Sequence, residues 1–435
     1  MRYTKSMFKS YIQKKLEKRV QQYLQKHPEI KLVVVTGSVG KTTTKNAIAT
    51  ILSEQFRVRM RNDNHNTGLS APVAMLGIDF PVGRVKSVWA WLAVLRAAKR
   101  RVKEPADVDV IVQELGTDRP GEIAHFGTYL RPAIAVVTAV TPEHMEFFGT
   151  IETVAKEELE AANFSEIGII NRDDIDGRFA EFITDSAIDT YGTTNAAEYY
   201  FETGDTLSLD GYKGKFNAPE LPSPLTTTLH VLGEHSMRPV TAAMTVACKL
   251  GMLPEMISRG AAKVRAVHGR MNVLEGANNS LLIDDTYNSS PAAVTAALQT
   301  LYSLDAPQRI AILGDMNELG AVSADEHRKL GEFCDPALLA WVITVGKQAE
   351  TYLAPAARAR GCQVKTFMSP IDAGAFARKV LEEGAVVLAK GSQGGIYTEE
   401  ALKILLRRTE DDRQLVRQSP EWMKTKQDYF DTLSG

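Results

Sequence analysis

A glycine-rich segment near the start of the chain carries the residue types that bind phosphate groups. Residues 31–45 read KLVVVTGSVGKTTTK, in which two glycines are followed by Lys41 and Thr42. Glycines let backbone N–H groups approach phosphate oxygens, a lysine neutralises their charge, and a threonine hydroxyl binds Mg²⁺. The segment therefore predicts a nucleoside triphosphate site. Its candidate residues are Gly37, Ser38, Val39, Gly40, Lys41, Thr42 and Thr43.

Two local elements must position this loop. The apolar, β-branched run Leu32–Val35 predicts a buried strand before it, and residues 46–52 have a helical pattern after it. The motif is the short form G-x-x-G-K-T, because the longer form needs a glycine where the chain has Val35. A strand-to-helix turn that binds no ligand is the alternative. The Lys-Thr pair directly after Gly40 argues against it.

Two more predicted strands lead to residues that bind metals. The strand at 108–114 ends at Glu114, and the strand at 133–137 leads toward His144. In an open α/β sheet the ligand crevice lies outside the carboxyl ends of the strands, so Glu114 and His144 should converge on the phosphate loop. A carboxylate and an imidazole there suit divalent metals that bridge phosphate oxygens. The alternative for each residue is a structural hydrogen bond.

Side-chain amides gather near the same expected sheet edge. Beyond a short strand predicted at 56–60 lies a polar cluster that includes Asn64, Asn66 and Thr67. Such a cluster belongs on a loop, where it either contacts substrate or forms a solvated turn. Asn171 follows a further predicted strand and is a candidate for contact with the nucleotide.

Length, charge and pattern predict the domain organisation. The 435-residue chain has a net charge of −2, which gives no bulk attraction to nucleic acid. Strand patterns at 281–285, 310–314, 341–346 and 386–390 alternate with helical patterns and predict a second, doubly wound domain. We therefore predict an α/β protein. It has a basic amphipathic helix at 1–30, a central P-loop domain with a mostly parallel sheet at 31–264, and a C-terminal domain at 265–435.

Two segments combine apolar and basic residues. In residues 1–30 an apolar side chain recurs every fourth residue from Phe8 to Leu24, beside many lysines. This helix either packs on the following domain or attaches to an anionic membrane surface. Residues 81–105 contain Trp89 and Trp91 before a basic end. They form either an ordinary packed helix or an interfacial helix.

The chain has no secretory signal and no membrane-spanning run, so we expect a cytoplasmic protein, with attachment to the inner membrane face as the alternative. We also expect a monomer.

Several segments together resemble the Mur ligase superfamily, and within it the branch that adds a dipeptide. The resemblance covers roughly residues 31–400. Its segments are TGSVGKTTTK (36–45), QELGTDRPGEI (113–123), TPEHMEFFGTIETVAKEE (141–158), INRDD (170–174), LGEH (232–235), HGRMNVLEG (268–276), IDDTYNSSP (283–291), LGDMNELG (313–320) and KGS (390–392). The resemblance implies an ATP-dependent carboxylate–amine ligase that works through an acyl phosphate, with a Rossmann-like C-terminal domain. It implies ATP and two Mg²⁺ ions as cofactors, with a muramoyl-peptide cell-wall precursor and D-alanyl-D-alanine or an amino acid as substrates.

The resemblance also implies roles for individual residues. Lys41 would hold the β- and γ-phosphates, Thr42 and Glu114 the first Mg²⁺, and His144 the second. Arg270 and Asp285 would reach the phosphates and the ribose, so that domain closure completes the site. Four residues of the C-terminal domain become substrate candidates, with a structural loop as the competing interpretation for the last three: Asn288, Asp315, Asn317 and Glu318.

Three departures from the family pattern matter. A carbamylated lysine is expected fourteen residues after His144, where this chain has Glu158. The Glu158 carboxylate either serves the second Mg²⁺ in its place or is a surface helix residue. Lys41, His144, Glu158 and Arg270 then form the expected catalytic set. Two asparagines expected to contact adenine are absent around Arg238, and the usual N-terminal uridine-nucleotide domain is missing, which points to a substrate held differently or linked to lipid.

Two other functions are compatible with the sequence. Another ligase of the superfamily, of γ-glutamyl or pseudomurein type, would use the same chemistry. A nucleotide-binding scaffold without ligase activity would keep the loop but not the reaction. Release of phosphate from ATP in the presence of candidate acceptors distinguishes these three.

Overall fold

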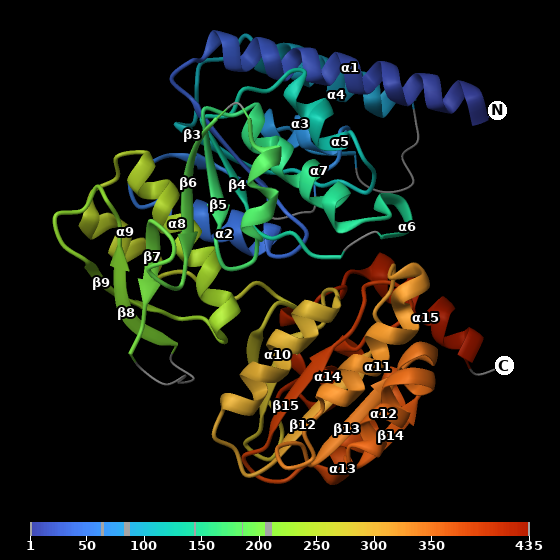
Figure 1. The fold of residues 1–435 in the computed structure, drawn as a ribbon. Coiled ribbons are helices and arrows are strands. Elements are labelled where there is room, and N and C mark those ends of the chain that lie inside the picture. Colours follow the sequence, from blue (N-terminus) through green and yellow to red (C-terminus); the bar gives the residue numbers. More distant parts are fainter. Residues whose placement is uncertain are drawn as a thin grey trace. The chain divides into compact units, whose positions relative to one another are not determined.

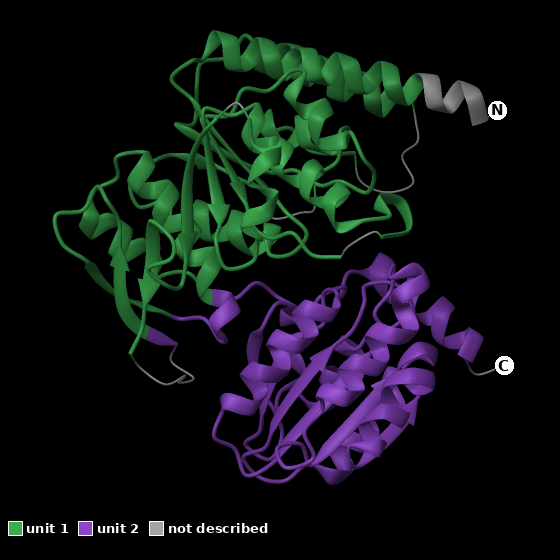
Figure 2. Ribbon diagram, in the orientation of Figure 1, with its two compact units in different colours: residues 1–205, 213–229, 237–264 green, residues 206–212, 230–236, 265–435 purple. Residues whose placement is uncertain are grey.

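The computed structural model describes residues 2–61, 65–81, 88–142, 145–184, 186–204 and 211–433, with side chains from residue 8 onward (Figure 1). The chain divides into two compact units (Figure 2). Unit 1 comprises Met1–Asp205, Lys213–Leu229 and Met237–Val264, and it therefore includes the N-terminal helix. Unit 2 comprises Thr206–Tyr212, His230–Ser236 and Arg265–Gly435.

Unit 1 is built on a sheet that has nine strands within the described residues, in the order β2-β3-β1-β4-β5-β6-β7-β8-β9. Its central strands β3, β1, β4 and β5 are parallel and almost wholly buried, as expected for continuous Val and Ile runs. Parallel pairing brings their carboxyl ends to one edge. These strands and the short edge strand are β1 (Lys31–Thr36), β2 (Val58–Arg59), β3 (Val110–Glu114), β4 (Ile134–Val137) and β5 (Ile167–Asn171).

The region after Asn171 extends this sheet. Strand β6 pairs in parallel with β5, and β7 with β6, before β8 pairs antiparallel with β7. Local alternation could not reveal this continuity, because it depends on pairing with distant residues. The strands are β6 (Ala187–Gly192), β7 (Tyr199–Glu202), β8 (Tyr212–Asn217) and β9 (Leu225–Leu229).

Helices cover the sheet of unit 1. The N-terminal helix packs its apolar side into the core through Ile12, Leu16, Val20 and Tyr23, each at most 1% exposed, as the packing interpretation predicted. Within the described residues no helix is long and apolar enough to cross a membrane. The helices are α1 (Arg2–Lys26), α2 (Lys41–Leu52), α3 (Ser70–Met75), α4 (Val88–Arg101), α5 (Glu122–Gly127), α6 (Met145–Phe148), α7 (Ile151–Asn163), α8 (Met237–Lys249) and α9 (Pro254–Ala261).

Unit 2 contains a six-stranded sheet in the order β10-β11-β15-β12-β13-β14, parallel except for β10. The strands are β10 (Asn272–Glu275), β11 (Leu281–Asp285), β12 (Arg309–Gly314), β13 (Trp341–Val345), β14 (Val364–Phe367) and β15 (Val386–Lys390). The helices are α10 (Pro291–Ser303), α11 (Ser323–Phe333), α12 (Ala354–Ala359), α13 (Pro370–Val380), α14 (Glu399–Leu405) and α15 (Pro420–Leu433). The predicted fold class, α/β with mostly parallel sheets, is confirmed. The edge strands β10 and β14 escaped prediction because they are short and partly exposed.

We expect Leu16→Ala to lower the free energy of unfolding by about 2–5 kcal/mol, because it leaves a cavity beneath α1. Tyr11→Ala on the same helix is the control. The Tyr11 side chain is 55% exposed, so its loss should change stability by less than about 0.5 kcal/mol. Denaturant titrations of the full chain compare the two variants. Equal midpoints for both would show that α1 does not pack on the rest of unit 1.

Candidate nucleotide site

The phosphate loop lies between β1 and α2 and is shaped by its two glycines. Gly37 has φ 123° and Gly40 has φ 90°, both in the region that disfavours other residues. A Cβ on Gly37 would lie 2.2 Å from the Thr138 side-chain oxygen and 2.8 Å from the Ala139 nitrogen. Only glycine therefore lets the loop pack this closely against the end of β4.

Residues that follow β4 fix the shape of the loop. The Ser38 amide donates to the Ala139 carbonyl at 2.9 Å, and the Thr138 hydroxyl donates to the Val39 carbonyl at 2.6 Å. Helix α2 starts directly afterwards at Lys41. The first-turn N–H groups of a helix lack intrahelical acceptors and carry partial positive charge, so this end attracts anions. The loop and the start of α2 are therefore suited to hold an anionic group such as a phosphate.

Glu158 braces the start of the loop. It lies on α7, is 3% exposed, and accepts hydrogen bonds from the Thr36 hydroxyl and, at 2.8 Å, from the Gly37 amide. The alternative of a surface helix residue is therefore wrong. Its neighbour Glu157 accepts at 2.7 Å from the amides of Gly121 and Ile123. One turn of α7 thus ties two loops at the carboxyl edge of the sheet.

Glu114 stands at the centre of a buried polar cluster. At the end of β3 its carboxylate accepts from the Thr42 hydroxyl at 2.9 Å and from the Asn66 amide group at 3.1 Å. The Lys45 ammonium lies 3.7 Å away, with both side chains at most 4% exposed, and it donates to the Arg61 carbonyl at 2.8 Å. Sequence reasoning missed Lys45. Its signal was a second cation one helical turn beyond Lys41, on a helix that carries no other charged residue.

The oxygens of Thr42 and Glu114 fit a magnesium ion. Mg²⁺ prefers hard oxygen ligands and is commonly held by one or two protein groups together with substrate phosphates. Among the residues that the structure describes, no group of three or more His, Cys, Asp or Glu side chains is placed to hold a metal.

Two predicted residues, His144 and Asn64, lie outside the described ranges. The exposed Thr67 lies on the loop beside Asn66 and bonds to the Ser70 hydroxyl at 2.9 Å.

Asn171 joins the end of β5 to residues at the neighbouring strand end. Its side chain is 1% exposed and donates at 2.7 Å both to the Thr138 carbonyl and to the Asp174 carboxylate. Arg238 lies between Ser236 and Pro239, which occupy the two positions where the resemblance expects asparagines. It pairs with Asp174 at 3.0 Å and with Asp173 at 3.3 Å. These contacts give Asn171 a structural role, and its contact with a nucleotide stays a prediction.

Unit 2 presents a second polar cluster at the carboxyl end of β11. The Asp285 carboxylate accepts from the Lys390 ammonium at 2.6 Å and from the Met271 amide at 3.2 Å. Lys390 also donates to the Asn288 carbonyl at 2.9 Å. The Arg270 guanidinium lies 4.3 Å from the centroid of the Tyr287 ring. Lys390 opens the KGS segment and was not predicted as a site residue.

The remaining substrate candidates occupy a loop after β12. The buried Asp315 carboxylate accepts from the Ala349 amide at 2.7 Å and from the Gln348 amide at 3.2 Å. Burial raises the pKa of Asp315 even though these amides oppose the shift. Asn317 donates from its side chain to the Gly394 carbonyl at 2.9 Å, and Glu318 has φ 65°. These contacts agree with the structural interpretation, and contact with substrate stays a prediction.

The fold and the loop indicate the class of protein. A phosphate loop that follows a buried parallel strand and opens a helix, with a carboxylate beside its threonine, is the mark of a P-loop nucleotide-binding protein. Residues 35–247 match the model of the Mur ligase middle domain, and residues 269–393 match that of the Mur ligase, glutamate ligase domain. The chain belongs to the Mur ligase family.

Relatives and solved structures agree with this family. The UDP-N-acetylmuramoyl-tripeptide–D-alanyl-D-alanine ligase of Escherichia coli (strain K12) is 29% identical over 322 residues, 73% of this chain and 65% of that enzyme. MurF from Acinetobacter baumannii superposes with a TM-score of 0.75 at 23% identity, over 90% of this chain and 80% of the other. MurF from Thermotoga maritima in complex with ADP gives 0.71 at 24% identity, over 91% and 84%. The structural matches establish likeness of fold.

Asp284, next to Asp285, makes the stability of the protein depend on pH. Burial raises its pKa to about 6, against the hydrogen bonds that it accepts from Thr286 and from the Gly269 amide. The folded state therefore keeps a proton that the unfolded chain loses at lower pH, so stability falls as pH rises from about 4 to 6.

We expect Asp284→Asn to remove this dependence. The unfolding free energy of the variant minus that of wild type should rise by roughly 1–3 kcal/mol from pH 4 to pH 7, because the amide does not ionise. Denaturant midpoints measured across this range check the result. The exposed Asp325→Asn is the control and should leave the profile unchanged. Parallel profiles for wild type and Asp284→Asn would contradict the prediction.

Proposed function

We propose that the protein is an ATP-dependent ligase that joins a carboxylate to an amine through an acyl phosphate. The observation that carries the proposal is the bond between Thr42 and Glu114 beside the phosphate loop, at the N-terminus of α2. Membership of the Mur ligase family supports it, as does the ADP bound in the Thermotoga maritima relative. The chain spans 65% of the length of the Escherichia coli relative, so the activity of that enzyme enters here as a proposal.

The proposed reaction answers a chemical problem. A carboxylate is a poor electrophile with a poor leaving group, so its oxygen first attacks the γ-phosphate of ATP and ADP departs. The amine nitrogen then attacks the carbonyl carbon, the bond to the phosphate oxygen breaks, and inorganic phosphate leaves as the amine loses a proton. Both steps concentrate negative charge on oxygen atoms. Groups that are already placed to receive this charge lower the barrier.

Residues of unit 1 supply the proposed stabilisation. The N–H groups at the start of α2 and the Lys41 ammonium would face the phosphates, since Lys41 already lies over the loop and donates to the Gly37 carbonyl. Thr42 and Glu114 would hold one Mg²⁺, which neutralises phosphate charge when bound. His144 and Glu158 are the proposed ligands of a second Mg²⁺. The buried position of Glu158 beside the loop supports its part in this pair.

We propose a muramoyl peptide as the carboxylate substrate and D-alanyl-D-alanine or a single amino acid as the amine. The name of the Escherichia coli relative supports the dipeptide. Arg270 and Asp285 of unit 2 are proposed to contact the phosphates and the ribose. The hydrogen bond from Asn66 to Glu114 supports a substrate role for the loop that carries Asn66, because it places that loop beside the phosphate loop.

A phosphate-release assay tests the function. We expect the wild-type chain to release phosphate from ATP only when a muramoyl peptide and a suitable amine are both present, with D-alanyl-D-alanine and single amino acids as the arms of the screen. Lys41→Ala should lower the rate about 100-fold or more, because it removes a cation from the transferring phosphate. Lys347→Ala, at a lysine whose side chain is 71% exposed in unit 2, is the control. ATP binding without turnover on any acceptor pair would favour a scaffold instead.

Glu158→Gln tests the second metal position. The amide keeps the size of the side chain but removes its charge, so we expect turnover to be lost while the chain stays folded. A carboxylate built into the chain needs no CO₂, so bicarbonate should not alter the wild-type rate. Steady-state rates in CO₂-depleted buffer, with and without added bicarbonate, check this. Full activity in Glu158→Gln would remove Glu158 from the reaction.

A further inference from the structure

Helices α1 and α4 form a surface of one charge, which we name the α1–α4 face. The two helices pack against each other and lie side by side (Figure 1). Eight of their basic residues are exposed: Lys9, Lys14, Lys15, Lys18, Lys26, Arg96, Lys99 and Arg100. Helix α4 contains no acidic residue, and the one acidic residue of α1 is Glu17. Glu17 is buried and bonded to His125 at 2.7 Å, so the exposed surface of the two helices is uniformly basic.

The same two helices expose large apolar side chains. Trp89 is 74% exposed and Val88 is 51% exposed at the start of α4, and Tyr11 on α1 is 55% exposed. Trp91, one residue beyond Ala90, behaves differently, because it packs edge to face on Phe80 at 5.4 Å between ring centroids. The core of unit 1 therefore uses Trp91 and leaves Trp89 at the surface. Exposed tryptophan next to lysine and arginine is typical of segments that lie in a membrane interface.

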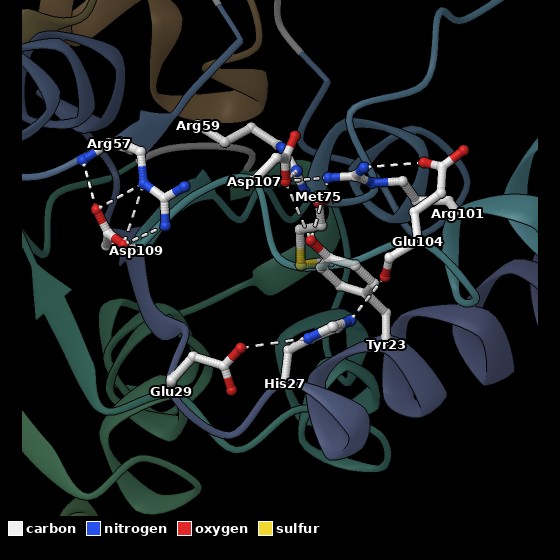
Figure 3. A network of polar contacts seen from close by, with 10 residues as sticks. All are labelled: Tyr23, His27, Glu29, Arg57, Arg59, Met75, Arg101, Glu104, Asp107 and Asp109. Carbon is white, nitrogen blue, oxygen red and sulfur yellow. Dashed lines mark hydrogen bonds and ion pairs between the residues drawn. The ribbon is translucent and has the colours of Figure 1, made fainter.

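A polar network holds the two helices in one rigid platform (Figure 3). The Tyr23 hydroxyl on α1 accepts from Arg101 at the end of α4 at 3.1 Å and donates to Asp107 at 3.3 Å. Arg59 on β2 and Arg101 both pair with Asp107. Burial alone would raise the pKa of Asp107, but the two arginines outweigh it and keep this pKa below its ordinary value. The carboxylate therefore stays charged at neutral pH and the network stays intact.

Further contacts fasten the C-terminal ends of the helices together. The Lys26 ammonium donates to the carbonyls of Val102 at 3.2 Å and Lys103 at 2.9 Å, and His27 bonds to the Glu104 carbonyl at 3.1 Å. These bonds use Lys26 and Arg101 within the protein, and Arg100 pairs with Glu104 at 3.4 Å while its side chain stays 78% exposed. The α1–α4 face is thus presented as a preformed surface.

We propose that the α1–α4 face docks on an anionic lipid bilayer, with its lysines and arginines at the headgroup phosphates and with Trp89 and Val88 inserted among the headgroups. An ordinary solvated face mixes charges of both signs, and this one does not. A second copy of the chain would bring like charge against like charge. Nucleic acid would pair with the cations, but it would not bury the apolar side chain of Val88 at the start of α4. The docking is independent of the proposed ligase activity, which a soluble-substrate assay measures separately.

Co-sedimentation of the full chain with lipid vesicles tests the proposal. We expect binding to vesicles of 70% phosphatidylcholine and 30% phosphatidylglycerol at low salt, no binding to phosphatidylcholine alone, and release by 0.5 M NaCl, because salt screens surface charge. Lys14→Glu/Lys18→Glu/Arg96→Glu/Lys99→Glu should weaken binding at least about tenfold. The matched control, Arg328→Glu/Lys329→Glu/Lys347→Glu/Arg407→Glu, reverses four exposed charges of unit 2 and should bind like wild type.

Tryptophan fluorescence tests the apolar part of the contact. Vesicles should shift the emission of the wild-type chain to the blue, and Trp89→Ala should lose the shift and bind several-fold more weakly, with an unchanged thermal midpoint. Three outcomes would overturn the proposal: no binding to the anionic vesicles at low salt, equal weakening in both fourfold variants, or binding of an RNA oligonucleotide without binding of the vesicles. Ligase activity that is absent while vesicle binding persists would count against the proposed function alone.

Discussion

A buried carboxylate at the end of β3 constrains the positions of the elements around it in unit 1. Removing the charge of Glu114 from water is costly unless partners replace the solvent, and three side chains from two elements supply those partners. Thr42 and Lys45 come from α2, and Asn66 comes from the loop before α3. A shift of helix α2 along the sheet would therefore leave the buried Glu114 carboxylate without these partners. The cluster holds a hydroxyl and a carboxylate oxygen together at the mouth of the phosphate loop.

The loop itself is fixed from the opposite side. Gly37 packs against the residues that follow β4, and its amide is bonded to Glu158 on α7. Asn171 then ties the end of β5 to the Thr138 carbonyl in the same layer. Strands β1, β4 and β5 are thus linked at one edge by side chains as well as by backbone pairing. An edge linked in this way needs little reorganisation when an anion arrives, which is the condition for strong electrostatic stabilisation.

Unit 2 repeats the same physical solution at its own sheet. Asp285 ends β11, Lys390 ends the neighbouring strand β15, and parallel pairing places the two residues opposite each other. Each buried ion carries further bonds, to the Met271 amide and the Asn288 carbonyl, so neither charge lacks a partner. In both units a candidate carboxylate ends a buried strand, Glu114 on β3 and Asp285 on β11, where a rigid position is combined with access to ligand.

Local signals in the sequence determined the phosphate loop, the strands that deliver Glu114 and Asp285, and the apolar side of α1. Each of these depends on residues within a few positions of one another, where spacing alone predicts structure. Only the tertiary structure decided that Lys45 neutralises Glu114, that Lys390 pairs with Asp285, and that Glu158 is buried against Gly37. The last two contacts join residues 105 and 121 positions apart. No local pattern encodes them, because they follow from the order and register in which strands and helices pack.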